Sequence, residues 1–327
     1  MRNVGIDLGK RRSYIIVEEN GKTVKEGYAD TTREGLCEFL PEDLETTVVI
    51  EASGALDRAA SILEGYRVKV AHPAKLKLIS MSTKKTDRND CRKLLDLNRA
   101  NALPEAYLPP KEIREARNLC RNRDFLVRQR TRVANRIRDQ AYRLAIEFSD
   151  INRQSLDILS SVSPILSSLV NEYRNTTKQI HALDGMIAQQ TAGNRNASLI
   201  DGIPGIGHFS ALGIASEIGD VSRFPSEDNL FAYAGLVPRL HQSGSTEWKG
   251  RCIDGNRFLK YMLIECTIIH VRLHSGSSIG LAFNRISERR GFKKARVAAA
   301  RHMLRAIYYM LRRNQSYDEY ERSRRAL

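Results

Sequence analysis

The chain has 327 residues, of which 42% are hydrophobic, and it carries a formal net charge of +15. This length predicts two or three domains, and the absence of any stretch near the roughly 20 apolar residues of a membrane span, or of a signal-peptide hydrophobic region after Met1, predicts a cytoplasmic protein. So large a positive charge favours nucleic acid as the partner, over an anionic membrane surface or a merely basic protein.

The first 108 residues alternate between strand and helix patterns. Short β-branched runs predict strands at 4–8, 14–19, 24–28, 46–50 and 67–71. Asn20-Gly21 marks a tight hairpin turn between the second and third of them. Helical spacing predicts helices at 32–40, 54–64 and 73–100. A hairpin followed by alternating helices and strands is the order of a ribonuclease-H-like sheet, so residues 1–108 are predicted to form an α/β domain.

Four carboxylates stand at marked positions in this domain. Asp7 and Glu51 end two of the predicted strands, and Asp87 and Asp90 share one face of a predicted helix. If the strand ends converge on that helix, four negative charges gather and repel one another unless a cation neutralises them. Hard divalent cations with oxygen ligands do this best, and such clusters support phosphodiester chemistry. We therefore predict that these four acids are catalytic and bind Mg²⁺ or Mn²⁺.

Residues 109–192 differ in character from the preceding domain. Between 111 and 148, eleven Lys and Arg residues accompany only five acids, and apolar residues recur at helical or heptad spacing. This pattern predicts a long, basic, coiled-coil-like helix. A second helical stretch at 155–190 is predicted to pack back on it as a hairpin. The excess of cations favours phosphate contact or helix pairing over a merely solvated face.

The third region, residues 193–327, begins with a glycine-rich turn. Gly205 and Gly207 precede a helical run to about 219, and such turns expose backbone amides at the positive end of a helix, where phosphates bind. The turn resembles that of helix-hairpin-helix modules, which hold DNA backbones without reading sequence. We therefore predict that both glycines contact nucleic acid, with a plain helix cap as the alternative.

A polar loop is predicted at 239–251, between two helical segments. Ser243 lies in this loop, and most loop serines are chemically inert. The cations of the loop are candidate contacts for nucleic acid: Arg239, Lys249 and Arg251. Residues 256–313 are predicted to be helical and basic, and the last dozen residues are predicted to fray. The third region is therefore expected to be mostly α-helical.

Cysteine and histidine patterns give no sign of a zinc site or a disulfide framework. The five cysteines are scattered and none forms a Cys-x-x-Cys pair. His270 and His274 have the spacing of two ligands on one helix, but no Glu follows the first and no third ligand is evident. Buried or surface histidines are the favoured interpretation.

Taken in order, these motifs resemble the DEDD transposases of one insertion-sequence family, which also contains the Piv-type DNA invertases. The matching motifs run almost end to end: Gly5 to Lys10, Glu51 to Gly54, Lys85 to Asp90, Ile203 to Gly207, Ala234 to Pro238 and Gln242 to Gly244. The resemblance implies a RuvC-like domain holding the four acids and a C-terminal transposase domain whose serine is Ser243. Two positions depart from the family pattern: Cys252-Ile-Asp254 follows Gly250-Arg251, and Lys260 replaces an arginine.

The resemblance also implies a mechanism. We expect a DNA transposase or site-specific recombinase in which the bound metal polarises a phosphate and Ser243 attacks it, forming a covalent phosphoserine link to DNA. The loop cations would stabilise the transition state. The resemblance further implies a homo-oligomer, a dimer or tetramer joined through the helices at 111–190, whose composite active site combines domains of different subunits. It implies as well a structured non-coding RNA that pairs with target and donor DNA.

Three other interpretations remain open at the level of sequence. A RuvC-like nuclease or junction resolvase would use the same acids with water as nucleophile. The Ile6-Asp-Leu-Gly9 segment also resembles the first phosphate loop of actin-like kinases, although a second phosphate loop and an adenosine segment are not evident. An architectural DNA-binding protein would use the glycine turn and basic helices but would leave the four acids unexplained.

Overall fold

The computed structural model describes residues 2–40, 45–54, 56–79, 86–238, 240–243, 246–250 and 255–325; for 78–79, 240–243 and 246–249 it describes the backbone alone. The chain divides into two compact units, Met1–Lys111 and Glu112–Leu327. The finer division into three domains stays a prediction. Within the described ranges, no helix has the length and apolar character needed to cross a membrane.

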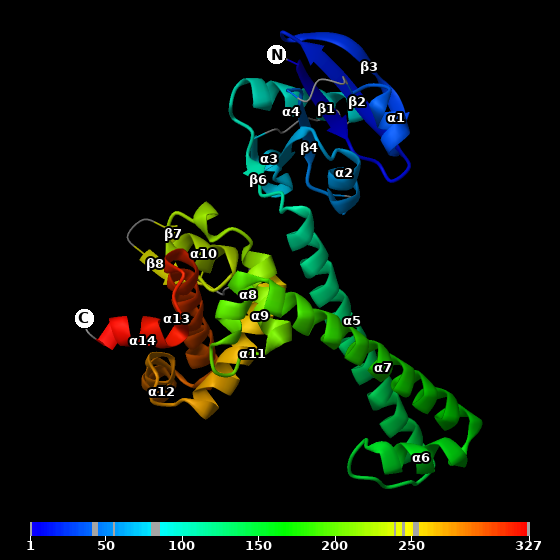
Figure 1. Cartoon of the computed structure of the whole chain (residues 1–327), viewed down its shortest axis with the longest axis vertical. Helices are drawn as coiled ribbons and strands as arrows, with labels where there is room; N and C mark the ends of the chain where they lie inside the picture. Colours follow the sequence, from blue (N-terminus) through cyan, green and yellow to red (C-terminus); the bar gives the residue numbers. More distant parts are fainter. Residues whose placement is uncertain are drawn as a thin grey trace. The chain divides into compact units, whose positions relative to one another are not determined.

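The first unit contains a six-stranded mixed sheet in the order β3-β2-β1-β4-β5-β6 (Figure 1). Strands β1 to β3 are antiparallel neighbours, β4 and β5 run parallel to β1, and β6 is antiparallel to β5. Their bounds are β1 Arg2–Asp7, β2 Arg12–Glu19, β3 Lys22–Asp30, β4 Thr47–Glu51, β5 Arg67–Ala71 and β6 Glu105–Ala106. All five predicted strands are present. Asn20 and Gly21 have φ of 50° and 81°, as the predicted tight turn requires.

Helices cover both faces of this sheet (Figure 1). Their bounds are α1 Arg33–Cys37, α2 Leu56–Ile62, α3 Pro73–Ile79 and α4 Asp87–Arg99. Ile6 and Ile50 belong to the core that contains Leu36 of α1, whereas Val49 packs with Leu94 of α4. Since successive side chains of a strand point to opposite faces, the odd-numbered positions of β1 and β4 face α4. The mixed α/β character predicted for the N-terminal domain is confirmed.

The second unit is mostly helical. Its elements are α5 Lys111–Arg143, α6 Arg153–Val162, α7 Pro164–Gly193, α8 Arg195–Asp201, α9 His208–Ile218, the 3₁₀ helix η1 Val221–Arg223, α10 Glu227–Tyr233, β7 Leu240–Ser243, β8 Thr246–Lys249, α11 Arg257–Leu273, α12 Ser278–Arg290, α13 Phe292–Arg313 and α14 Tyr317–Arg325. Its core joins apolar residues of α9, α11 and α13, among them Leu212, Leu263 and Ile307. Helix α9 is buried all round from Ala211 to Ile218, so it lies inside this core.

Helices α5 and α7 lie side by side as a long hairpin, as predicted (Figure 1). Ile137 packs with Leu166 and Val170, and Arg123 pairs with Asp184 at 2.9 Å. The single stretch predicted at 155–190 is in fact two helices. Ser163 caps α7 with its side chain and Pro164 occupies the first turn of that helix, a position where proline is favoured.

Two C-terminal predictions were wrong. The predicted loop at 239–251 contains a β-hairpin, in which Leu240 pairs with Lys249 and Ser243 with Thr246. Cross-strand backbone pairing, which local sequence does not reveal, forms it. The chain end does not fray over its whole length, because α14 buries Tyr317 and Tyr320 against the core. Aromatic burial outweighs the high charge of this helix.

Candidate functional site

Two of the four predicted acids lie on the same face of the sheet at adjacent strand ends. Strands β1 and β4 are parallel neighbours, with Ile6 opposite Ile50. The next residue on each strand is an acid, Asp7 on β1 and Glu51 on β4, and both are half-buried. Because parallel neighbours in register point to the same face, both carboxylates belong to the face that α4 covers. The sheet alone therefore brings these two acids together, as predicted.

Close packing holds α4 against this face. A Cβ at Gly5 would lie 2.9 Å from the carbonyl oxygen of Cys91 and 2.9 Å from Cγ of Leu95. Only glycine thus allows α4 to approach β1 so closely. The backbone N–H of Asp7 donates to Sγ of Cys91 at 3.1 Å, and that thiol donates to the carbonyl oxygen of Tyr14 at 3.1 Å. These contacts fix the first turns of α4 beside the end of β1.

Asp87 and Asp90 lie in the first turn of α4. The side chain of Thr86 caps this helix by accepting from the N–H of Asn89, and acids in the first turn are stabilised by the helix dipole. Asp87 accepts a hydrogen bond from the Tyr28 hydroxyl at 3.0 Å, and Asp90 pairs with Lys93 at 3.2 Å. The hydrogen bond to Asp87 is the main reason that the pKa of Tyr28 is raised.

The buried Cys91 thiol reports how close three of these acids are. Its pKa is raised to about 12, first by burial and then by the negative charges of Asp7, Asp87 and Asp90. Three carboxylates from β1 and α4 therefore act electrostatically on one atom. Cys91 stays protonated at neutral pH and serves as a packing and hydrogen-bonding group.

The donor set fits a hard divalent cation in chemistry, because all four side chains offer carboxylate oxygens. Over the ranges that the structure describes, no three His, Cys, Asp or Glu side chains are grouped closely enough to hold a metal ion. Asp87 and Asp90 are instead directed to Tyr28 and Lys93. The structure thus brings the backbone positions of the acids to one face of the sheet, while the four-ligand metal site stays a prediction.

The predicted serine lies in the second unit. Ser243 is the last residue of β7, at the turn of the β7–β8 hairpin, and Lys249 ends β8. Only their backbones are described. Arg239 and Arg251, the other two predicted phosphate contacts, lie outside the described residues, as do Cys252 and Asp254. Ser243 is thus the last described residue of β7, where its backbone pairs with Thr246 of β8.

The two glycines predicted to bind nucleic acid have different surroundings. Gly205 has φ of +90°, and a Cβ there would lie 2.7 Å from the backbone nitrogen of His270, so glycine is required for packing against α11. His270 is buried, with one ring nitrogen bonded to the Pro204 carbonyl oxygen and the other to the Ser277 hydroxyl. Gly207 is exposed, has open space beside it and begins α9 without a side-chain cap. Nucleic-acid contact at these glycines stays a prediction.

Sequence reasoning missed a buried charge network that joins α5, α9 and the start of α11. Glu217 of α9 is fully buried and pairs with Arg121 at 2.7 Å and Arg117 at 3.7 Å, both on α5. Oε2 of Glu217, the oxygen nearest Arg117, also accepts from the side-chain amide of Asn256 at 2.7 Å, and Asn256 caps α11. A single acid within the apolar run of α9 was the available signal, since such a charge is buried only when it is paired.

Comparisons with known proteins place the chain among DNA transposases. Two family models match: one of DEDD transposases of the IS110 type over residues 4–145, and one described as the transposase IS116/IS110/IS902 family over residues 197–279. The two matches cover the strand-end acids and the glycine turn with the hairpin, respectively.

Several curated transposases resemble the chain over most of its length. The transposase for insertion sequence element IS1111A of Coxiella burnetii is 26% identical over 83% of the chain and 79% of its own length. The transposase for insertion sequence element IS1328 of Yersinia enterocolitica is 25% identical over 82% of the chain and 84% of its own length. The pilin gene-inverting protein of Moraxella bovis is 33% identical over 38% of the chain and 40% of its own length.

The chain belongs to the IS110 family of DEDD transposases. It is a DNA transposase or recombinase, and the family's acid set indicates the use of a divalent metal. The resemblance inferred from the sequence motifs is thereby confirmed.

Proposed function

We propose that this transposase cuts and rejoins DNA through a covalent link between Ser243 and a DNA phosphate, with Asp7, Glu51, Asp87 and Asp90 holding Mg²⁺. The observation that carries the proposal is the register of β1 and β4, which aligns Asp7 with Glu51 on the face where α4 brings Asp87 and Asp90. We take the domain that holds these acids to be RuvC-like, because an antiparallel hairpin followed by parallel strands supports a ribonuclease-H-like sheet.

The chemistry of the chain's own groups follows from this assignment. The Ser243 hydroxyl oxygen forms a bond to phosphorus while the bond from phosphorus to the departing DNA oxygen breaks. The hydroxyl proton is lost to solvent and the departing oxygen gains one. In rejoining, a hydroxyl of another DNA end attacks the same phosphorus and releases the serine. Arg239, Lys249 and Arg251 are assigned to stabilise the negative charge of the transition state.

A divalent cation, when bound, supplies Lewis-acid polarisation of the phosphate oxygens. The four acids would hold that ion: Asp7 and Glu51 from half-buried positions at the ends of β1 and β4, and Asp87 and Asp90 from the first turn of α4. Mg²⁺ is assigned rather than a softer metal because every proposed ligand is a carboxylate.

Ser243→Ala tests the nucleophile. The full-length protein is incubated with a duplex carrying its element's end, Mg²⁺ and co-expressed RNA, and the products are separated on denaturing gels. The wild type is expected to retain labelled DNA on the protein, and Ser243→Ala to retain none. Ser245→Ala, two residues along the chain, is the matched control and should keep the adduct. If Ser243→Ala cuts and rejoins DNA at the wild-type rate, water is the nucleophile and the protein acts as a RuvC-like nuclease.

We also assign two partners by family resemblance. One is a structured non-coding RNA encoded by the element, which would guide target choice. The other is a second or further copy of this chain, joined through the α5–α7 hairpin. Exposed apolar side chains near the tip of that hairpin support association there: Ile158, Val162 and Ile165. Ile158→Glu/Ile165→Glu should lower the mass measured by light scattering to that of one chain, whereas an unchanged mass would place the contact elsewhere.

A further inference from the structure

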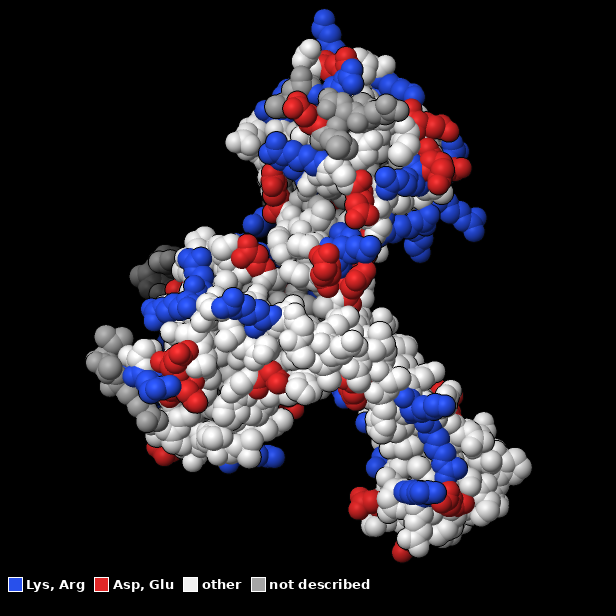
Figure 2. Space-filling model, viewed as in Figure 1, with Lys and Arg blue, Asp and Glu red and all other residues white. Residues whose placement is uncertain are grey.

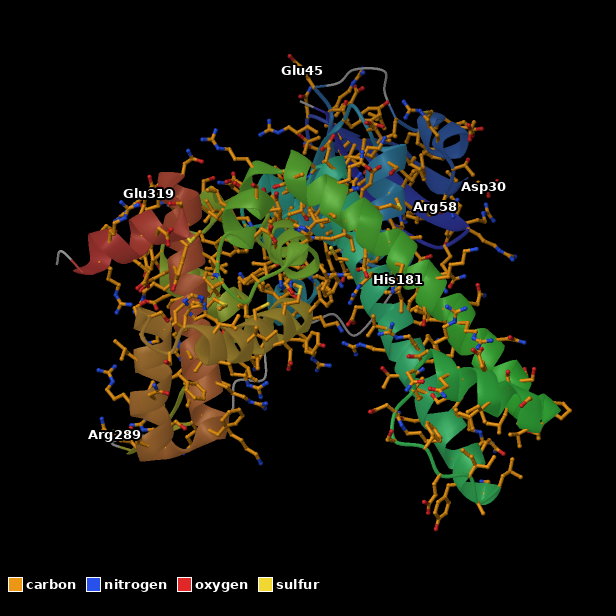
Figure 3. All side chains as sticks on the ribbon, turned by 60° about the horizontal axis from the view of Figure 1, so that its bottom comes forward. Asp30, Glu45, Arg58, His181, Arg289 and Glu319 are labelled. Carbon is orange, nitrogen blue, oxygen red and sulfur yellow. The ribbon has the colours of Figure 1, made fainter. Side chains whose placement is uncertain are left out.

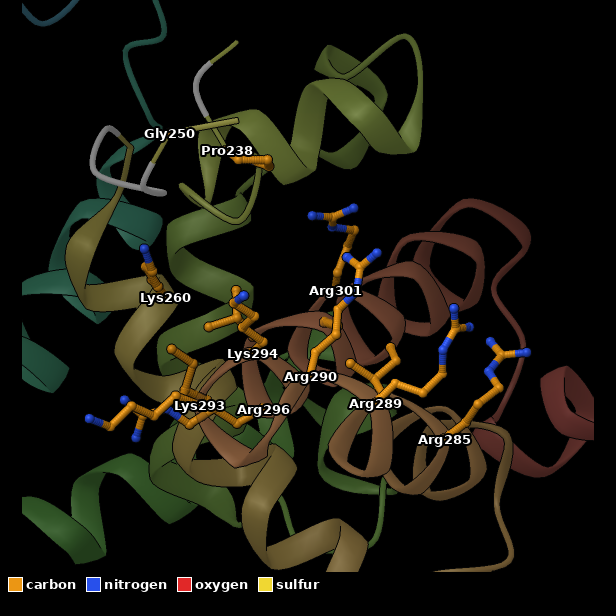
Figure 4. A pocket seen from close by; sticks show the side chains of 14 residues that line it. Pro238, Gly250, Lys260, Arg285, Arg289, Arg290, Lys293, Lys294, Arg296 and Arg301 are labelled. Carbon is orange, nitrogen blue, oxygen red and sulfur yellow. The ribbon is translucent and has the colours of Figure 1, made fainter. Parts of the chain in front are cut away.

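A cleft in the second unit is lined almost entirely by cations and apolar side chains. Its volume is about 990 Å³, at the upper end of the range for small-ligand sites. The charged residues that line it come from the start of α11, the end of α12 and the first half of α13, and all of them are basic: Lys260, Arg285, Arg289, Arg290, Lys293, Lys294, Arg296 and Arg301. Figure 4 shows these side chains projecting around the open space from adjoining helices.

Seven of the eight lining cations are not balanced by an acid over the part of the chain that is described. Leaving Lys260 aside, none of the lining cations forms an ion pair with a described acid. The Nε atoms of Arg296 and Arg301 are buried donors without a hydrogen-bond partner among the described atoms. Further along α13, Arg305 pairs with Glu227 at 2.7 Å, so this helix does pair a cation where an acid is at hand. Uncompensated like charges are costly, which points to an anionic ligand.

His302, on α13 beside Arg301, reports the positive potential. Its pKa is lowered to about 4, first by burial and then by the charges of nearby arginines: Arg305, Arg324, Arg285 and Arg301. Two of these arginines, Arg285 and Arg301, line the cleft. The local field therefore disfavours a further positive charge and favours an anion.

The cleft is long enough for several phosphates. Lys293 and Arg301 are eight residues apart on α13, a span of about 12 Å along the helix axis. One strand of duplex DNA advances about 3.4 Å along the duplex axis per phosphate, so this span corresponds to about three to four phosphate steps. Ile264, Ile286 and Val297 give the cleft an apolar floor, suited to the sugars between the phosphates. A chain of phosphodiesters fits this combination better than an isolated phosphate.

The cleft adjoins the hairpin that carries Ser243. Pro238 and Gly250 line it, and they flank the paired ends of β7 and β8, where Leu240 lies opposite Lys249. Strand β7 thus begins, and β8 ends, beside the rim of the cleft. Arg289 lies near the C-terminal end of α12, at the outside of the helical unit (Figure 3). A DNA strand bound in the cleft could therefore continue into solvent on the side of Arg289.

We propose that this cleft binds the DNA backbone on one side of the phosphate that Ser243 attacks. The assignment of the neighbouring phosphate rests on the proposed function. Lys260, the departure from the family pattern, keeps a positive charge at the hairpin side of the cleft. The apolar side chains and the cations of the cleft bind any strand by its backbone, so the cleft contributes affinity and position rather than sequence choice.

The test neutralises three exposed cations of the cleft in the full-length protein, as Arg289→Gln/Lys293→Gln/Lys294→Gln. The matched control removes the same charge from exposed positions away from the cleft, as Lys178→Gln/Arg195→Gln/Arg272→Gln. Equilibrium binding to an end-of-element duplex is measured in EDTA over a range of salt concentrations. Loss of three phosphate contacts should lower the slope of log affinity against log salt by about 2.7 for the cleft variant, and leave it nearly unchanged for the control.

A second measurement locates the contact. Methylphosphonates, which carry no charge, replace three phosphates on one side of the cleavage position and then three on the other. On one of the two sides, the methylphosphonates should weaken binding of the DNA to the wild type. They should not weaken binding to the cleft variant, because that variant has already lost the contacts. An equal loss of affinity for the wild type and the cleft variant, on both sides of the cleavage position, would overturn the assignment.

Three other outcomes would overturn the proposal. An unchanged salt slope for the cleft variant, or an equal fall for the control, overturns the proposal. A fall seen with an RNA of equal length but not with the DNA duplex overturns it too, and reassigns the cleft to RNA. Because binding is measured without cleavage, failure of the serine mechanism appears separately, as a covalent adduct that persists in Ser243→Ala.

Discussion

The acid face of the first unit is the sheet face that carries Asp7 and Glu51 and packs against α4. It and the cationic cleft of the second unit are built from different kinds of contact. On the first, regular sheet register and the close approach of α4 at Gly5 bring carboxylates together. In the second, the start of α11, the end of α12 and the first half of α13 bring cations together. Both arrangements hold like charges near one another, and each is complementary to a ligand of the opposite sign. The mixture of acidic and basic side chains visible over the surface of the first unit (Figure 2) contrasts with the single sign of charge in the cleft.

The largest effect is expected when the acid face loses one of its charges. Asp7→Asn keeps the shape of the side chain but removes the charge at the end of β1, and strand cleavage should fall by roughly 10³-fold, because metal stabilisation of the transition state is worth several kcal/mol. Gel assays of cleavage by the full-length protein measure this. Asp96→Asn, at an exposed acid of α4 that pairs with Arg99, is the control and should retain activity. Cleavage near the wild-type rate by Asp7→Asn would remove this acid from the metal site.

Glu217→Gln tests whether the second unit depends on its own buried charge. The substitution leaves the guanidinium of Arg117, whose side chain is 16% exposed, without its anion. Removing one partner of a buried ion pair should lower the free energy of unfolding by about 3 kcal/mol, measured by urea denaturation. Glu115→Gln, at an exposed position of α5, should change it by less than about 0.5 kcal/mol. A similar small change for Glu217→Gln would mean that the network contributes little.

Addition of Mg²⁺ tests whether the acid face binds a cation. If the acid face binds Mg²⁺, a concentration a hundred times the dissociation constant should stabilise the first unit by about 2.7 kcal/mol. Hydrogen exchange, which resolves the two units, should locate the added protection to β1, β4 and α4. The protection should vanish in Asp7→Asn. Protection that persists in this variant would assign the ion to another place.

Gly5→Ala tests the packing that brings α4 to the sheet. The added methyl group would contact Cys91 and Leu95 of α4, and overpacking of this kind should cost about 1 to 3 kcal/mol. Cleavage should fall as well, since Asp87 and Asp90 move with α4. Gly54→Ala, whose Cβ would meet open space, is the matched control. Full stability and activity of Gly5→Ala would show that α4 can be displaced without harm.

The smallest effect concerns pH. The pKa of His302 is lowered to about 4 in the folded protein, mainly by burial, and that of His270 is lowered for the same reason. In the unfolded chain each histidine binds a proton near pH 6.5, so the unfolded state gains protons first as the pH falls. Stability should therefore decline between about pH 6.5 and pH 4. His302→Gln should flatten this decline in pH-dependent urea curves, and an unchanged decline would assign it to other groups.

Sequence patterns were sufficient for much of the fold. The strands of the first unit, the tight turn at Asn20 and Gly21 and the long helical hairpin follow from local periodicity and turn chemistry. Two C-terminal elements were not predicted. The β7–β8 hairpin was assigned to a loop because its short polar strands show no clear alternation, although their pairing is local. The α14 helix was assigned to a frayed end because the burial of Tyr317 and Tyr320 is a tertiary effect.

By itself the sequence determined the chemical inventory: two acids at strand ends and two at a helix start, a serine beside a glycine, and an excess of cations. Only the tertiary structure decided how these groups are placed. Register between β1 and β4 set Asp7 beside Glu51, and the missing side chain of Gly5 let α4 approach them. Likewise, basic residues spread along α12 and α13 became one cleft because the two helices pack against each other. Local periodicity encodes the elements, whereas the electrostatic environment of a site depends on contacts between elements distant in sequence.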